Sequence, residues 1–142
     1  MMSKEDDQPI VLLFHGSRKA QGNTSARLLK KKFSASLPLR RVESAFLQFS
    51  KPSLESILRA LATESPRRII ILPLILFKGK HLSEEVESTV SRVKRDFPIQ
   101  RIVIADEIAS SPLLLEILHS QLKQCETPSQ QQCKESITPR SS

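Results

Sequence analysis

The chain of 142 residues has the length of one ordinary domain, and its 39% hydrophobic and 26% charged residues, with neither Trp nor Tyr, are typical of a globular protein with an aliphatic core. Its formal net charge of +7 favours an anionic partner or a solvated basic surface. The longest apolar run, at 69–77, is too short for a membrane span, and the acidic start MMSKEDDQP is unlike a signal peptide, so we expect a cytoplasmic protein.

The first third of the chain predicts two strands with a helix between them. The nearly continuous apolar run IVLLF at 10–14 is typical of a strand that is covered on both faces of a sheet. Asn23 or Thr24 offers an N-cap for a helix that runs to about Ser36. The stretch RVESAFLQF at 41–49 predicts the second strand.

The remaining elements repeat this alternation. Pro52 is expected in the first turn of a second helix, where its missing N–H costs nothing. That helix carries an apolar stripe at Leu54, Ile57, Leu58 and Leu61. The run at 67–77 predicts the third strand with the loop after it, and the next helical stripe consists of Leu82, Val86, Val90, Val93 and Phe97. A fourth strand is expected at 101–105, and a last helix, opened by Pro112, over 111–123.

Four strand–helix pairs in succession call for right-handed crossovers and a parallel sheet with helices on both faces. We therefore expect an α/β fold, a three-layer domain around a four-stranded parallel sheet, over residues 9–125. Residues 1–8 are expected to form a flexible N-terminus, and residues 126–142, rich in Gln, Ser, Thr and Pro, a disordered tail. Cys125 and Cys133 lie in polar sequence, so we do not expect a disulfide framework to hold the core.

Two of the three histidines are expected at one edge of this sheet. Ligands of open parallel sheets bind beyond the carboxyl ends of the strands, where His15 follows the first strand and His81 follows the third. Either residue alone is typical of a strand end or an ordinary loop. Together they favour a metal site, because neutral imidazole is a common ligand of divalent transition metals. Without cysteines nearby the metal would be held only briefly, and His119 is expected to be exposed on the last helix.

Charged side chains flank the two histidines. Glu84 and Glu85 follow His81 in the first turn of the next helix, where the helix dipole commonly stabilises acidic side chains. Glu85 shares the face of His81 if the helix begins early. Four cations flank the same loops, namely Arg18, Lys19, Lys78 and Lys80. They fit a substrate with several carboxylates, or they are solvated loop charges.

Nucleotides and nucleic acids are weaker alternatives for the anionic partner. The stretch HGSRKAQGN contains two glycines but matches neither GxGxxG nor GxxxxGK[ST], so a nucleotide site is poorly supported. The chain also lacks zinc-finger spacing, a basic helix followed by heptads, and an aromatic strand for base stacking, so we expect no nucleic-acid partner.

Three blocks, LLFHGSRKAQGN, AFLQFSKPSLESIL and RRIIILPLILFKGKHLSEEVE, resemble the short CbiX-type class II chelatases, the sirohydrochlorin cobaltochelatase and ferrochelatase family. The resemblance implies that a divalent metal (Co²⁺, Fe²⁺ or Ni²⁺) is inserted as a substrate into sirohydrochlorin without a nucleotide or a tightly bound cofactor. It implies a metal site at His15 and His81, catalysis by these two residues and Glu85, and substrate binding by Ser17 and the four flanking cations. It also implies a cytoplasmic homodimer in cobalamin or sirohaem biosynthesis.

The chain departs from this family's pattern at the end of the second strand. Family members commonly have a glutamate where this chain has Gln48, and often another acid where it has Lys51. A non-catalytic protein that binds a tetrapyrrole or a metal is therefore the alternative to a chelatase. The two cysteines are too few to supply the four ligands of an iron–sulfur cluster unless a second chain contributes.

Overall fold

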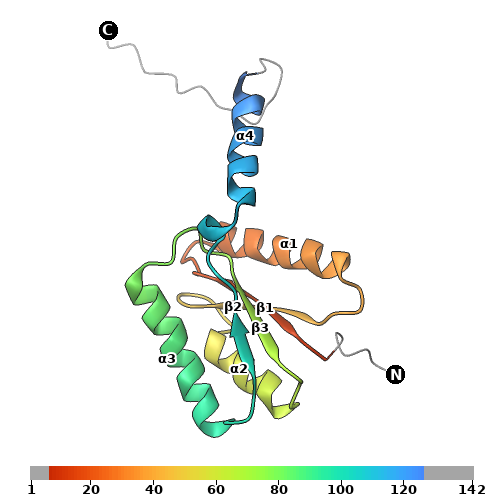
Figure 1. Ribbon diagram of the computed structural model, residues 1–142, viewed down its shortest axis with the longest axis vertical. Helices are drawn as coiled ribbons and strands as arrows, with labels where there is room; N and C mark the ends of the chain where they lie inside the picture. The colour runs from red at the N-terminus through yellow and green to blue at the C-terminus, as the bar shows by residue number, and fades with distance from the viewer. Residues whose placement is uncertain (1–6, 127–142) are drawn as a thin grey trace. The chain divides into compact units, whose positions relative to one another are not determined.

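The computed structural model describes residues 7–126 (Figure 1). Four short strands form one parallel sheet in the order β2-β1-β3-β4. They are β1 (Ile10–Phe14), β2 (Val42–Phe46), β3 (Ile69–Pro73) and β4 (Ile102–Ile104). The predicted four-stranded parallel sheet is confirmed, and β1 lies inside it between β2 and β3.

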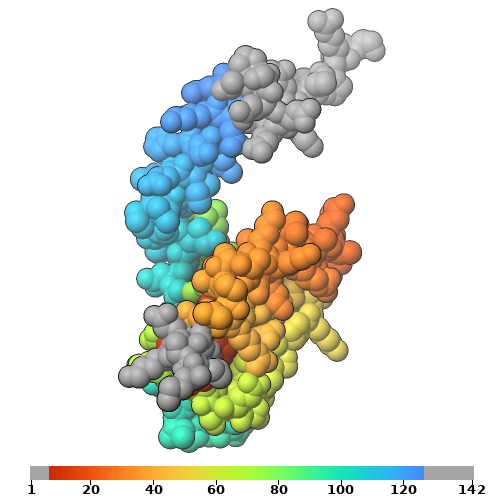
Figure 2. All heavy atoms as spheres, turned by 90° about the vertical axis from the view of Figure 1, so that its right-hand side faces the viewer, coloured from red at the N-terminus to blue at the C-terminus, as the bar shows by residue number. Residues whose placement is uncertain are grey.

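Helices lie on both faces of the sheet, as the alternating pattern predicts (Figure 1). They are α1 (Ala20–Ser36), α2 (Leu54–Thr63) and α3 (Lys80–Asp96). Side chains of α2 and α3 belong to one core cluster with the sheet, while Phe33 of α1 packs against a second cluster. The three-layer α/β architecture is therefore confirmed. The outer face of α1 remains in contact with solvent, as the orange surface in Figure 2 shows.

The continuous apolar sequence of β1 results from its central position. Val11 and Leu13 point into the cluster with α2 and α3, whereas Ile10 and Leu12 belong to the cluster on the α1 side. Alternate side chains of a strand point to opposite faces, so a strand between two helical layers needs apolar residues at every position. Each such buried side chain contributes about 1.5 to 3 kcal/mol to folding.

Several element boundaries differ from those expected. α1 begins at Ala20 with Lys19 as its N-cap, one turn before the expected caps Asn23 and Thr24. Asn23 instead uses its side chain to hold the preceding loop, donating to the Ser17 carbonyl at 3.1 Å. The strand expected over 41–49 ends at Phe46.

The start of α2 also corrects the expectation. Pro52 lies before the helix rather than in its first turn, and Ser53 is the N-cap, with its hydroxyl oxygen accepting from the backbone N–H of Ser56 at 3.2 Å. The predicted apolar stripe is confirmed, because Leu54, Leu58 and Leu61 are buried in the core. β3 lies within the run that was expected to hold the third strand and its loop, and β4 is one residue shorter at each end than the expected 101–105.

Residues 109–126, the last part of the chain that the structure describes, belong to a second compact unit. The short 3₁₀ helix η1 (Ile108–Ser110) leads to α4 (Leu113–Glu126), which extends beyond the expected 111–123. None of the residues of α4 is buried. Cys125 lies in its last turn and is disulfide-bonded.

The ends of the chain lie largely outside the described residues. The expected flexible N-terminus is described only at Asp7 and Gln8, where the Asp7 carboxylate accepts from the backbone N–H of Arg67 at 3.0 Å. The expected disordered tail, with Cys133, is described only at its first residue, Glu126. Within residues 7–126, no helix is long and apolar enough to cross a membrane.

Candidate metal and substrate site

His15 is the first residue after β1, at the carboxyl edge of the sheet, and it is exposed. Its main chain remains paired with the segment after β2. The Leu47 N–H donates to the Phe14 carbonyl at 3.0 Å, and the Gln48 N–H donates to the His15 carbonyl at 3.0 Å. The imidazole is therefore attached to a backbone that the sheet holds on one side.

Gly16 allows this close approach of the two segments. Its φ is +96°, and a Cβ on this residue would lie 1.7 Å from the Gln48 carbonyl oxygen. A side chain at this position would collide with main-chain atoms, while a positive φ is itself unfavourable for residues other than glycine. Steric contact with the segment after β2 thus explains why glycine follows His15 in the sequence.

The loop after Gly16 is held by side chains from two other segments. The Ser17 carbonyl accepts from the Asn23 amide at 3.1 Å and from the Ser50 hydroxyl at 3.3 Å. The single proton of the Ser50 hydroxyl is shared with Asn23 Oδ1, which lies closer, at 2.8 Å. The Ser17 hydroxyl accepts from the Lys19 N–H at 3.1 Å, so this predicted substrate-binding residue orders the start of α1. A cavity of about 200 Å³ borders this loop and includes His15 in its wall.

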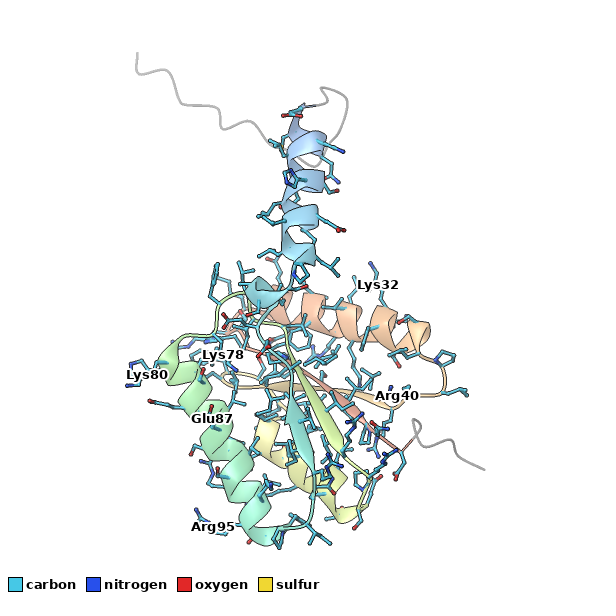
Figure 3. All side chains as sticks on the ribbon, viewed as in Figure 1. Lys32, Arg40, Lys78, Lys80, Glu87 and Arg95 are labelled. Atoms are coloured by element: carbon cyan, nitrogen blue, oxygen red, sulfur yellow. The ribbon has the colours of Figure 1, made fainter. Side chains whose placement is uncertain are left out.

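His81 is the second residue of α3, and its side chain is fully exposed. Glu84 lies one turn further along the helix, with its carboxylate 4.0 Å from His81 Nδ1 and 3.9 Å from the Lys80 ammonium nitrogen. Figure 3 shows Lys78 and Lys80 near the N-terminal end of α3. The helix therefore starts early enough for both acids to follow His81 within one turn, and Glu84 is the one in contact with it.

Glu85, the predicted catalytic acid, faces another part of the molecule. It borders a cavity of about 200 Å³ together with Glu55 and Arg92. Glu55 accepts hydrogen bonds from Arg92 and Arg59, and these bonds lower the pKa of the Glu55 carboxyl, the Arg92 bond most strongly. Glu85 is half-buried beside this ion-pair network.

His81, expected in a loop, lies in α3, and the loop that leads from β3 to this helix is attached to the segment after β4. The Glu107 carboxylate accepts from the Lys78 N–H at 2.6 Å, and the Ile108 N–H donates to the Ile75 carbonyl at 3.1 Å. Sequence reasoning missed Glu107, because an acid in the segment ADEIASSP carries no motif. It also missed Ser50, which was assigned to no element.

The topology brings the two predicted histidine loops to one sheet edge. β1 and β3 are adjacent and parallel, so the loops of His15 and His81 leave from neighbouring strand ends. Among residues 7–126, no group of three or more His, Cys, Asp or Glu side chains is placed to hold a metal ion. His119 lies exposed on α4.

These features define a class: an open parallel α/β protein with one histidine directly after β1 and a second at the start of the helix that follows β3. The sequence model of the CbiX family matches residues 9–125. The chain therefore belongs to the CbiX family.

Three known proteins show the extent of the similarity. The chain is 22% identical over 120 residues to the chloroplastic sirohydrochlorin ferrochelatase of Arabidopsis thaliana, covering 84% of this chain and 53% of that protein. It is 26% identical over 119 residues to the sirohydrochlorin cobaltochelatase of Sulfurisphaera tokodaii, covering 81% of this chain and 91% of that protein. The structure of SirB from Bacillus subtilis with Fe³⁺ superposes with a TM-score of 0.75 at 22% identity, covering 85% of this chain and 48% of that one. The chain thus spans about half the length of two of these proteins.

Proposed function

We propose that this protein is a chelatase that inserts a divalent metal, Co²⁺ or Fe²⁺, into sirohydrochlorin. Membership of the CbiX family and relatives named as sirohydrochlorin chelatases support the reaction. The observation that carries the proposal for this chain is the placement of His15 and His81 after the adjacent strands β1 and β3, at the edge where parallel sheets bind ligands.

The chemistry asks for groups that hold a metal briefly and accept protons. The macrocycle loses two pyrrole N–H protons while the metal sheds water, and a neutral imidazole serves as a metal ligand or as a proton acceptor. His15 and His81 are both exposed and hence accessible to a large substrate. Glu85 stays our predicted catalytic acid, and Glu84 joins it as a candidate because of its contact with His81. Neither proton removal nor metal transfer needs a nucleotide, so we propose an ATP-independent activity. We assign it to the lyase class.

The cations of the same loops are proposed to bind the substrate's carboxylates. Arg18 and Lys19 follow His15 along the chain, while Lys78 and Lys80 precede His81. Their positive charge attracts and orients an acidic substrate before the ring meets the metal site. Ser17 takes part by ordering the turn that carries Arg18, through its hydrogen bond with the Lys19 N–H.

A homodimer is the proposed assembly. The chain covers about half of the Arabidopsis protein and of the SirB chain, so two copies together match the length of either. Exposed apolar side chains of α4 supply a surface for association, namely Leu113, Leu115, Ile117, Leu118 and Leu122. We further propose a cytoplasmic location, and cobalamin or sirohaem biosynthesis as the pathway.

A non-catalytic protein that binds the tetrapyrrole or the metal is the second candidate. Gln48 favours it, because an amide stands beside His15 where the family commonly has a carboxylate that can take up a proton. An anaerobic absorbance assay with sirohydrochlorin and Co²⁺ or Fe²⁺ separates the two. Multiple turnovers support the chelatase, and a spectral change limited to one equivalent supports the binding protein.

The same assay tests the site. Replacing His15 or His81 by Ala is expected to lower the rate of metal insertion at least about a hundredfold, the scale for losing an acid–base group. His119→Ala is the matched control and should keep the wild-type rate. Thermal midpoints should be unchanged in all three variants, because each histidine is exposed. Normal rates for folded His15→Ala and His81→Ala would refute the assignment.

A further inference from the structure

Phe49 has an unusual backbone conformation next to the His15 loop. Among residues 7–126, two residues other than glycine have a positive φ, Phe49 at 61° and Ser65 at 53°. Ser65 directly follows the C-cap of α2, where a left-handed residue commonly ends a helix. Phe49 lies in the loop after β2, where the left-handed region is an outlier for a bulky side chain and must be held by its surroundings.

The surroundings hold this loop on both sides of Phe49. The Gln48 N–H donates to the His15 carbonyl at 3.0 Å, and the Ser50 hydroxyl donates to the Ser17 carbonyl at 3.3 Å. These bonds fasten the residues before and after Phe49 to the loop that carries His15. The conformation that is fixed this way leaves the Phe49 side chain exposed and in contact with Arg18 rather than in the core.

The ring of Phe49 is exposed and carries a cation. Its residue is 55% exposed, and the Arg18 guanidinium carbon lies 4.5 Å from the ring centroid, within the range of a cation–π contact. Arg18 makes no ion pair with an acid in the described part of the chain. Its planar set of N–H donors therefore remains available to a carboxylate.

We propose that Phe49 and Arg18 form one binding element for the tetrapyrrole, in which the Phe49 ring packs on the macrocycle and Arg18 binds a peripheral carboxylate. This inference rests on the proposed substrate. A flat apolar ring with carboxylates at its rim needs an aromatic or apolar surface next to cations, and Phe49 with Arg18 supplies both within 4.5 Å. Stacking also removes from water the apolar surface that Phe49 leaves exposed.

The test is an anaerobic titration of the full chain with metal-free sirohydrochlorin, followed by absorbance. Phe49→Asn removes the ring but keeps the loop conformation, because Asn tolerates a positive φ. We expect it to raise the dissociation constant roughly tenfold, whereas Phe49→Tyr, which keeps the ring, stays within about twofold of wild type. Ile99→Asn is the matched control: Ile99 is 94% exposed just before β4, at the opposite edge of the sheet, and its substitution should leave binding unchanged.

A double-mutant cycle then tests the link to Arg18. Arg18→Ala should weaken binding in the wild-type background and have a clearly smaller effect in the Phe49→Asn background, because the ring no longer holds the guanidinium. Additive effects would overturn the proposed single element. The role of Phe49 would be overturned if Phe49→Asn bound sirohydrochlorin with the same dissociation constant as wild type, whether or not its oligomeric mass changed.

The titration separates this inference from the proposed activity. Weakened binding in Phe49→Asn supports the binding element even if wild-type protein shows no turnover with Co²⁺ or Fe²⁺, a result that would refute only the chelatase. Normal turnover with unchanged binding in Phe49→Asn refutes only the binding element. A wild-type protein that binds no sirohydrochlorin overturns both.

Discussion

Replacing Gly16 by Ala tests whether contact between the β1 and β2 loops holds the histidine in place. The added Cβ would lie 1.7 Å from the Gln48 carbonyl oxygen and 2.9 Å from its carbonyl carbon. Both are main-chain atoms, so the collision cannot be relieved by turning a side chain. The two segments must separate, and the bond from the Gln48 N–H to the His15 carbonyl breaks.

The expected cost follows from the two interactions that change. A left-handed conformation costs a residue other than glycine about 1 to 2 kcal/mol, and the lost hydrogen bond contributes about 1 kcal/mol. The free energy of unfolding should therefore fall by about 2 to 3 kcal/mol, which lowers the thermal midpoint of a domain of this size by about 8 to 12 °C. Metal insertion should fall as well, because His15 moves with its loop.

Circular dichroism during heating measures this change, and Gly79→Ala is the matched control. No atom lies within 4 Å of a Cβ on Gly79, and its φ is −66°. The same chemical change there should alter the stability by no more than about 1 kcal/mol. A thermal midpoint for Gly16→Ala equal to that of wild type would refute the steric argument.

Three further results are expected. Glu107→Ala removes the acceptor of the Lys78 N–H and should lower kcat/KM for metal insertion about tenfold. Glu107→Gln, which keeps an acceptor oxygen, should restore most of this loss. Equal rates for Glu107→Ala and wild type would contradict the role of Glu107 in holding the loop between β3 and α3. The hydrogen bonds of Glu55 lower the pKa of its carboxyl. Its contribution to stability is therefore present above the usual carboxyl pKa and is lost as the pH falls through the lowered pKa. The thermal midpoint of Glu55→Gln should consequently decline less steeply than that of wild type between about pH 7 and pH 3. Reversing Lys78 and Lys80 together to Glu should raise KM and flatten its salt dependence with kcat nearly unchanged, while Arg95→Glu, at the far end of α3 (Figure 3), should leave KM as it is.

Apolar runs predict β1 and β3, because these are the two inner strands of the sheet and helices cover both of its faces. The same holds for α2, whose stripe of leucines faces the core. The start of α1 was misplaced because Asn23 has the chemistry of an N-cap but forms its hydrogen bonds with a loop. A side chain that bonds across the fold cannot be distinguished by local sequence from one that caps a helix.

The candidate site was predictable only in part. The positions of His15 and His81 follow from strand order, since both come after strands that a parallel sheet places side by side. Contacts between distant segments were not predictable, among them Ser50 with Ser17, Glu107 with Lys78, and Arg18 with Phe49. Each depends on loop conformation, which no periodic pattern encodes.

Gln48 supports His15 through its main-chain N–H alone, while its side chain is exposed. The scaffold thus places few demands on the identity of this side chain. We therefore expect that substituting Glu, Asp, His or Ala there changes a side chain near the proposed metal site without moving the loop that carries His15. Position 48 is therefore where we expect one substitution to alter the metal preference and the rate of the proposed reaction while the architecture stays constant.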